Sequence, residues 1–199
     1  MQLSPGQFWH WFRGFAGRLP DIDVPESLQD ELLEQLQRYD DRLYYLMAVG
    51  AEPKELIITA EGNTEAFDSA DALVEAALAL EGWSFFSLKP PLGFDCRFQD
   101  GPIDLDVASL WFMPLMSPSY PDLLGVQIGF PDADFVLDNQ SVDAAYTILE
   151  LAIGERSVAE DIAHVAVDDL PDSPEENGYL ELPRLPEFIE FHKRRDGGK

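Results

Sequence analysis

The segment spanning residues 55–89 constrains the fold more than any other part of the chain. "ELIITA", at 55–60, is a short apolar run rich in β-branched residues, which is typical of a buried strand. A helical pattern follows at 64–80, and "WSFFSLK", at 83–89, has the composition of a second strand. Because a helix between two strands packs its apolar face on their sheet, the segment predicts a strand–helix–strand unit.

A glycine marks the end of this predicted helix, and two prolines mark the end of the strand that follows it. Gly82 follows the helix as a C-terminal cap, and Pro90 and Pro91 end the second strand. The predicted inner face of the helix consists of Phe67, Ala70, Val74, Ala77 and Leu78.

The turn Glu61-Gly62-Asn63 before the helix has two interpretations. Free N–H groups at a helix start can bind an anion, so Glu61 and Asn63 are candidate pocket residues. However, Glu61 would compete with an incoming anion, and Asn63 can accept hydrogen bonds from those N–H groups as a cap. We therefore interpret the turn as structural and keep the pocket as an alternative.

The first part of the chain predicts two helices and two strands, which form either a hairpin or two neighbouring strands of one sheet. Ser4 and Pro5 begin a helix whose broad aromatic arc (Phe8, Trp9, Trp11, Phe12 and Phe15) is typical of a core-facing surface. A second helix is predicted at 25–39 from the helical spacing of its leucines. Two strands, at 42–50 and 54–60, are separated by the turn residues "AEPK".

The second half predicts further strands and two helices. Strands are predicted at 103–113, 123–130 and 160–167, with a helix at 141–153 that Gly154 ends. An acidic loop, "DDLPDSPEENG", separates the last strand from a C-terminal helix at 185–195. No boundary is evident, so we expect one α+β domain over 1–199: a mixed, mostly antiparallel sheet covered by helices.

The chain is strongly acidic. Its 199 residues include 38 Asp or Glu and 13 Lys or Arg, a formal net charge of −25. Between Phe98 and Pro183 there are 18 acidic residues and a single base, Arg156. Such a surface repels nucleic acid phosphates and anionic lipids and suits a basic protein, although acidity also simply favours solubility.

The predicted cellular compartment depends on two kinds of segment that the sequence lacks. No apolar run approaches the length of roughly 20 residues that a membrane span needs. The first residues do not have the pattern of a secretion signal, and the single cysteine, Cys96, fits a reducing compartment. These features predict a cytoplasmic protein.

Motifs for catalysis, cofactors or metals are missing. The sequence contains no nucleophile elbow, phosphate loop or dinucleotide fingerprint. His10, His164 and His192 are scattered without metal-ligand spacing, and no neighbouring base would activate Cys96. We therefore assign no catalytic, cofactor or metal residue and favour a protein that is not an enzyme.

Four blocks, "FWHWF", "ELIITAEGNTEAF", "LEGWSFFSLKPP" and "LELAIGE", resemble in this order a family of uncharacterised bacterial proteins. The resemblance spans most of the chain and consists of fold-type patterns. It implies a single bacterial α/β-type domain of unknown function and carries no activity, cofactor or site residue.

Three functions remain open. The first is an acidic protein-binding module, such as a bacterial immunity, inhibitor or adaptor protein, with a basic partner; its candidate binding residues are Asp132, Asp134, Asp138, Asp168, Asp169, Asp172, Glu175 and Glu176. The second is a metal-dependent or carboxylate-based hydrolase that uses some of Glu61, Asp104, Asp106, Asp132 and Asp134. The third is a small-molecule sensor with a pocket near Trp11 and Trp83.

Overall fold

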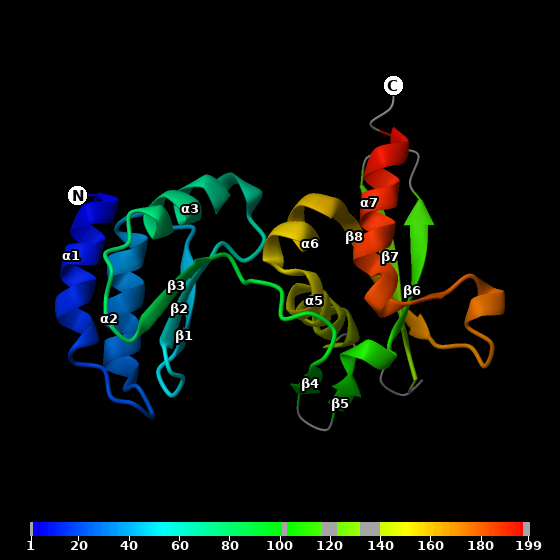
Figure 1. Cartoon of the computed structure of the whole chain (residues 1–199), viewed down its shortest axis with the longest axis horizontal. Helices are drawn as coiled ribbons and strands as arrows, with labels where there is room; N and C mark the ends of the chain where they lie inside the picture. Colours follow the sequence, from blue (N-terminus) through cyan, green and yellow to red (C-terminus); the bar gives the residue numbers. More distant parts are fainter. Residues whose placement is uncertain (1, 101–102, 117–122, 132–139, 197–199) are drawn as a thin grey trace. The chain divides into compact units, whose positions relative to one another are not determined.

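The computed structural model describes residues 2–100, 103–116, 123–131 and 140–196. Contacts between Cα atoms divide the chain into two compact units, Met1–Pro90 and Pro91–Lys199. Each unit combines helices and strands, so the chain has the predicted α+β class (Figure 1). The division at Pro90 was not predicted, and the expected single domain over 1–199 stays a prediction.

Unit 1 begins with two helices. Helix α1, Pro5–Ala16, starts as predicted: Ser4 accepts a hydrogen bond from Gln7 N–H, and the Gln7 side chain accepts one in return from Ser4 N–H. Helix α2, Glu26–Gln37, buries Leu32 and Leu36. Both helices lie on one side of a three-stranded sheet (Figure 1).

The sheet of unit 1 contains the predicted hairpin and the predicted strand–helix–strand unit. Strand β1, Tyr44–Ala48, pairs antiparallel with β2, Lys54–Thr59, and β2 pairs parallel with β3, Trp83–Ser87. A short 3-10 turn, Thr64–Ala66, and helix α3, Phe67–Glu75, connect β2 to β3. The strand order is β1-β2-β3.

Helix α3 is shorter than the sequence predicts. It ends at Glu75, so the prediction that it reaches residue 80 was wrong. Leu78, expected on the inner face, is 43% exposed, whereas Leu73 is buried instead. The chain turns early because Trp83 must lie opposite Lys54 in the sheet, and this tertiary requirement overrides the helix propensity of the alanines.

Aromatic side chains fill the space between α1 and the sheet, as predicted. Phe8, Trp9, Phe12 and Phe15 are buried, and the Trp9 ring lies 4.5 Å from that of Phe85 in β3. Trp9 Nε1 also donates a hydrogen bond of 2.6 Å to the carbonyl of Leu73.

Unit 2 is built on a four-stranded sheet of order β8-β7-β6-β9. Strands β6, Trp111–Met116, and β7, Leu124–Phe130, are antiparallel, and β7 is parallel to β8, Ile162–Asp169. The short strand β9, Leu180–Glu181, pairs with β6. Strands β4 and β5 (Arg97–Asp100 and Ile103–Asp106) pair antiparallel in a separate two-stranded sheet, so the described residues form three sheets where the sequence predicts a single sheet.

The predicted strand at 103–113 is interrupted in the structure. A 3-10 turn, Val107–Ser109, separates β5 from β6, and the Asp106 side chain caps it by accepting a hydrogen bond from Ala108 N–H at 3.1 Å. The sequence pattern missed this break because the capping residue also fits the polar alternation of a strand.

Helices complete unit 2. Helix α5, Gln140–Ile153, is followed by α6, Glu155–Asp161, and the last helix is α7, Leu185–Asp196. Helix α6 was not predicted, and the final strand therefore begins at Ile162 rather than at residue 160. Short 3-10 turns lie at Glu175–Asn177 and Leu182–Arg184.

One face of the unit 2 sheet carries the core. Alternate residues of β7, namely Leu124, Val126, Ile128 and Phe130, are buried in one cluster with side chains of α5 and α7. The opposite face of β7 carries Gly125, Gln127 and Gly129, and this face positions the candidate site described below.

Candidate functional site

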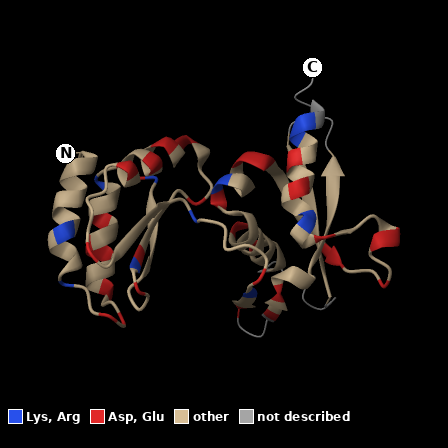
Figure 2. Ribbon diagram, viewed as in Figure 1, with Lys and Arg blue, Asp and Glu red and all other residues tan. Residues whose placement is uncertain are grey.

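The candidate site is the acidic segment, residues 168–178, which joins β8 to β9. Asp168 and Asp169 are the last residues of β8, and Glu175 and Glu176 lie in the 3-10 turn that follows. In the ribbon of Figure 2, the Asp and Glu positions of this connection are coloured red. Five of the eight acidic residues predicted for partner binding thus lie on one continuous stretch of chain.

Hydrogen bonds to β7 fix the start of the acidic segment. Leu170 N–H donates to the carbonyl of Phe130 at 2.8 Å, which continues the ladder beyond the end of β8. Gln127 Nε2 lies 3.3 Å from Asp168 Oδ2 and 2.7 Å from the hydroxyl of Tyr179. A single side chain in the middle strand therefore ties both ends of the segment to the sheet.

Turn chemistry fixes the middle of the segment. The Asn177 side chain donates to the carbonyl of Ser173 at 2.8 Å, and Tyr179 N–H donates to the carbonyl of Pro174 at 3.0 Å. Gly178 has φ 86°, a left-handed conformation that costs glycine little. The segment is therefore a bonded turn rather than a loose connection.

Gly129 lets the acidic segment lie directly on the sheet. A Cβ atom at this position would be 2.7 Å from Leu170 Cδ1 and 2.9 Å from Tyr179 Cε1. Both distances are far below van der Waals contact, so the two side chains occupy space that only a glycine leaves open. Sequence reasoning missed Gln127, Gly129 and Tyr179; the only signal was the small and polar alternation "GVQIG" within an apolar strand.

The acidic side chains of the segment face solvent. Asp168, Asp169, Asp172, Glu175 and Glu176 are all exposed. Within the described part of the chain, no Lys or Arg forms an ion pair with any of them. By contrast, Glu31 pairs with Arg18 at 2.7 Å. The segment therefore presents uncompensated negative charge.

The remaining predicted binding residues, Asp132, Asp134 and Asp138, lie outside the described residues.

The turn Glu61-Gly62-Asn63 is a structural corner. Asn63 Oδ1 accepts a hydrogen bond of 3.2 Å from Glu65 N–H, so the asparagine caps the helical turn as expected. The Glu61 carboxylate lies 3.3 Å from Lys89 Nζ. The pocket alternative for Glu61 and Asn63 stays a prediction.

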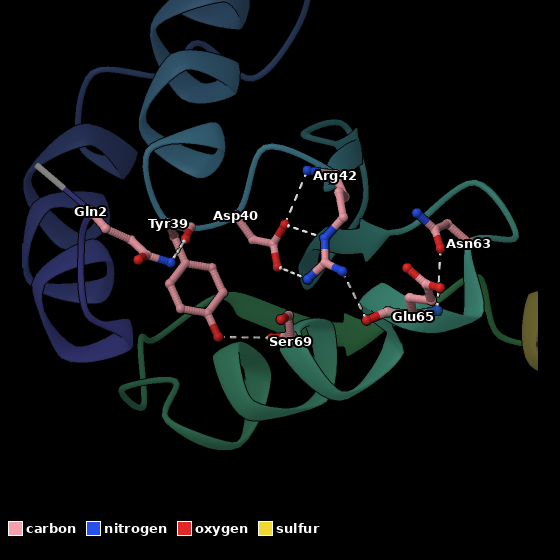
Figure 3. Close-up of polar contacts among 7 residues, drawn as sticks. All are labelled: Gln2, Tyr39, Asp40, Arg42, Asn63, Glu65 and Ser69. Carbon is pink, nitrogen blue, oxygen red and sulfur yellow. Dashed lines mark hydrogen bonds and ion pairs between the residues drawn. The ribbon is translucent and has the colours of Figure 1, made fainter.

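A polar cluster beside this corner links four parts of unit 1 (Figure 3). The Arg42 guanidinium contacts both carboxylate oxygens of Asp40, at 2.9 and 2.6 Å, and donates to the carbonyl of Glu65 at 3.1 Å. Gln2 donates to the carbonyl of Tyr39, whose hydroxyl donates to the carbonyl of Ser69. The Arg42 hydrogen bonds hold the pKa of Asp40 well below its usual range. Because the polar groups of the cluster form hydrogen bonds with one another, the cluster connects separate elements of unit 1.

Asp104 and Asp106, two of the acidic residues proposed for hydrolysis, take part in local structure. Asp104 Oδ1 lies 2.7 Å from Arg97 Nη2, and this contact lowers the pKa of Asp104. Asp106 caps the turn after β5. No group of three or more His, Cys, Asp or Glu residues suited to a metal ion occurs among the residues with described placement.

Cys96 and the proposed sensor residues have packed surroundings. Burial, and to a smaller extent Asp95 and Asp106, raise the pKa of the Cys96 thiol, which lies 3.4 Å from the carbonyl of Gly93. The Trp11 ring stacks on Phe15 at 4.7 Å, and the Trp83 ring lies 5.2 Å from Phe12. These aromatic rings pack against one another.

Comparison of the chain with protein-family models, curated proteins and solved structures found no match. The resemblance to a family of uncharacterised bacterial proteins therefore stays a prediction. In the described ranges, no helix combines the length and the apolar composition that crossing a membrane requires.

Proposed function

We propose that the chain is a protein-binding module that uses the acidic segment of unit 2 to bind a basic protein. One observation carries the proposal: five exposed acidic side chains without ion-pair partners, among the residues described, stand on a segment held in place by Gln127, Gly129 and Tyr179.

Fixed geometry favours binding for an entropic reason. Ordering a loose loop on association costs free energy, and a segment already bonded to a sheet avoids most of that cost. Asp172, Glu175 and Glu176 can therefore meet Lys or Arg side chains without a rearrangement of the backbone.

The charge of the whole chain supports the same class of partner. A net charge of −25 accelerates the approach of a basic protein and slows that of an acidic one. Long-range attraction is screened beyond about 8 Å at physiological ionic strength, so contact specificity must come from a local feature such as the acidic segment. An immunity, inhibitor or adaptor role for the chain is the concrete form of this proposal.

The test compares two variants that lose the same charge in different places. The loop variant carries Asp168→Asn, Asp169→Asn, Asp172→Asn, Glu175→Gln and Glu176→Gln. The control variant carries Glu34→Gln, Asp41→Asn, Glu52→Gln, Glu75→Gln and Glu81→Gln, at positions that are also exposed. Each variant removes five negative charges, so non-specific attraction falls equally in both.

Wild type and both variants are immobilised and exposed to native lysate, and retained proteins are eluted with rising salt and identified by mass. We expect a basic protein that wild type and the control variant retain, that the loop variant loses, and that elutes at moderate salt. Equal retention by the loop and control variants would show attraction by net charge alone and would contradict the proposal.

A further inference from the structure

Strand β1 lies at the edge of the unit 1 sheet, because the order β1-β2-β3 gives it a neighbour on one side only. The other side of β2 is fixed by two hydrogen bonds: Leu88 N–H donates to the Ile58 carbonyl at 2.7 Å, and Lys54 N–H donates to the Gly82 carbonyl at 2.8 Å. The N–H and C=O groups of successive residues in a strand point to opposite sides. Because those of Lys54 and Ile58 point away from β1, those of Glu55 and Ile57 point toward it.

This alternation decides which groups of β1 point outward. Ile57 faces β1, and its register partner is Leu46, so Leu46 is bonded to β2. The N–H and C=O groups of Tyr45 and Met47 consequently point away from the sheet. Within the described residues, neither backbone forms a hydrogen bond on that outer side. Two donors and two acceptors are therefore free along the edge.

A groove of about 410 Å³ runs beside this edge, between β1 and the start of α2. Its lining residues are Val24, Gln29, Tyr45, Leu46, Met47 and Val49. The Tyr45 hydroxyl donates to the Gln29 carbonyl at 3.0 Å, and Gln29 Nε2 donates to the Val24 carbonyl at 2.8 Å. The two walls are thus tied together, and the lining combines the apolar side chains of Val24, Leu46, Met47 and Val49 with polar groups of Gln29 and Tyr45.

Acidic residues lie next to residues of the groove in the sequence. Asp23 and Glu26 flank Val24 closely in the sequence, and both are exposed. Asp30 follows Gln29 and is exposed, and its charge contributes, after burial, to the raised pKa of Tyr45. In the described ranges, no ion pair involves any of these three acids.

We propose that the edge of β1 binds an extended segment of a partner protein as an added strand, with apolar side chains in the groove and Lys or Arg side chains toward Asp23, Glu26 and Asp30. Backbone hydrogen bonds from a strand edge supply affinity in this mode, and a side groove supplies selectivity. A second copy of the chain fits less well, because it brings its own net charge of −25 toward these acidic residues. This surface belongs to unit 1 and does not depend on the acidic segment of unit 2.

The first measurement is amide hydrogen exchange of the free protein, followed by NMR. We expect the Tyr45 and Met47 amides to exchange much faster than those of Tyr44 and Leu46, which are bonded to β2. Equal protection of all four amides would mean that the edge is already covered and would overturn the inference.

The second measurement titrates a blocked heptapeptide of alternating Lys and Val, with alternating Glu and Val as the control peptide. The Lys peptide should shift and protect the Tyr45 and Met47 amides, and the Glu peptide should not. Shifts confined to residues 168–178 would overturn the β1 inference while leaving the proposed function of the acidic segment intact.

A proline variant isolates the backbone contribution. Met47→Pro removes one outward N–H without removing a bond to β2, whereas Met47→Ala keeps that N–H and removes the side chain. Relative to Met47→Ala, Met47→Pro should weaken peptide binding about threefold to tenfold, the value of one hydrogen bond. Thermal unfolding confirms that both variants fold, and equal peptide affinities would contradict strand addition. A wild-type dimer in sedimentation that Met47→Pro abolishes would assign the edge to a second copy and also overturn the inference.

Discussion

Asp40 forms an ion pair with Arg42 that connects two parts of unit 1. Its side chain is 10% exposed, and its carboxylate accepts hydrogen bonds from the backbone and the side chain of Arg42. Through Arg42, the same group is linked to the carbonyl of Glu65 at the start of the helical connection (Figure 3). The pair therefore joins the end of α2 to the corner that precedes α3.

Asp40→Asn should destabilise the protein by about 1–2 kcal/mol at neutral pH, because hydrogen bonds to a charged group are lost. The Arg42 contacts lower the folded-state pKa of Asp40 below the unfolded value of about 3.9. The stabilisation is therefore complete above that value and is lost as pH falls toward the folded-state pKa. Urea unfolding of wild type and variant between about pH 7 and pH 3 measures the difference.

Asp41→Asn is the matched control, since Asp41 is exposed and takes part in no ion pair within the described chain. It removes the same charge and should leave the stability almost unchanged. A difference between wild type and Asp40→Asn that stays constant over the whole pH range would contradict this assignment.

At the residue scale, the sequence predicted contacts between near neighbours. Ser4 and Asn63 were identified as caps, because a cap joins a side chain to a backbone group two or three residues away. The pairing of Gln127 with Tyr179 was not predicted, because 52 residues separate them.

The acidic segment is the element on which the proposed function depends, and Gly129 decides where it lies. Gly129→Ala should destabilise unit 2 by about 1–3 kcal/mol, because the new methyl group overlaps Leu170 and Tyr179. It should also increase cleavage of residues 168–178 by a protease that cuts after Asp and Glu. Urea unfolding and timed proteolysis measure the two effects.

Gly14→Ala is a suitable control, since a Cβ at that exposed position in α1 would meet no atom within 4 Å apart from its chain neighbours and the backbone of its own helix. It should stabilise the helix by about 0.5–1 kcal/mol. Unchanged proteolysis of Gly129→Ala would show that the segment does not depend on this close approach.

Element types were predicted better than element ends. The strand–helix–strand unit was found from local periodicity, but α3 ends at Glu75, where Ala77 N–H donates to the Val74 carbonyl at 2.9 Å. Helix α6 was missed because Gly154 correctly predicted the end of α5 and also precedes a new helix. The end of a helix or strand depends on the position of the next element in the fold. A short window of sequence does not contain that information.

For the whole molecule, charge is the property with the widest consequences. With a net charge of −25, repulsion between carboxylates opposes the compact state, and salt screens that repulsion. Raising NaCl from about 0.02 to 0.3 M, which shortens the Debye length from roughly 20 to 6 Å, should therefore raise the thermal midpoint. Circular dichroism melts measure the shift, with an uncharged osmolyte at the same osmolality as the control. A midpoint that falls with salt would mean that the ion pairs outweigh the repulsion.

The sequence by itself determined the α+β class, the aromatic core of α1, the caps and the acidity of the acidic segment. Each of these follows from residue type and short-range periodicity. Only the tertiary structure decided that the described strands form three sheets in two units, that Gly129 lets the acidic segment lie on β7, and that β1 has an open edge. These features depend on which distant strands pair, and pairing is set by the packing of the whole chain rather than by any local pattern.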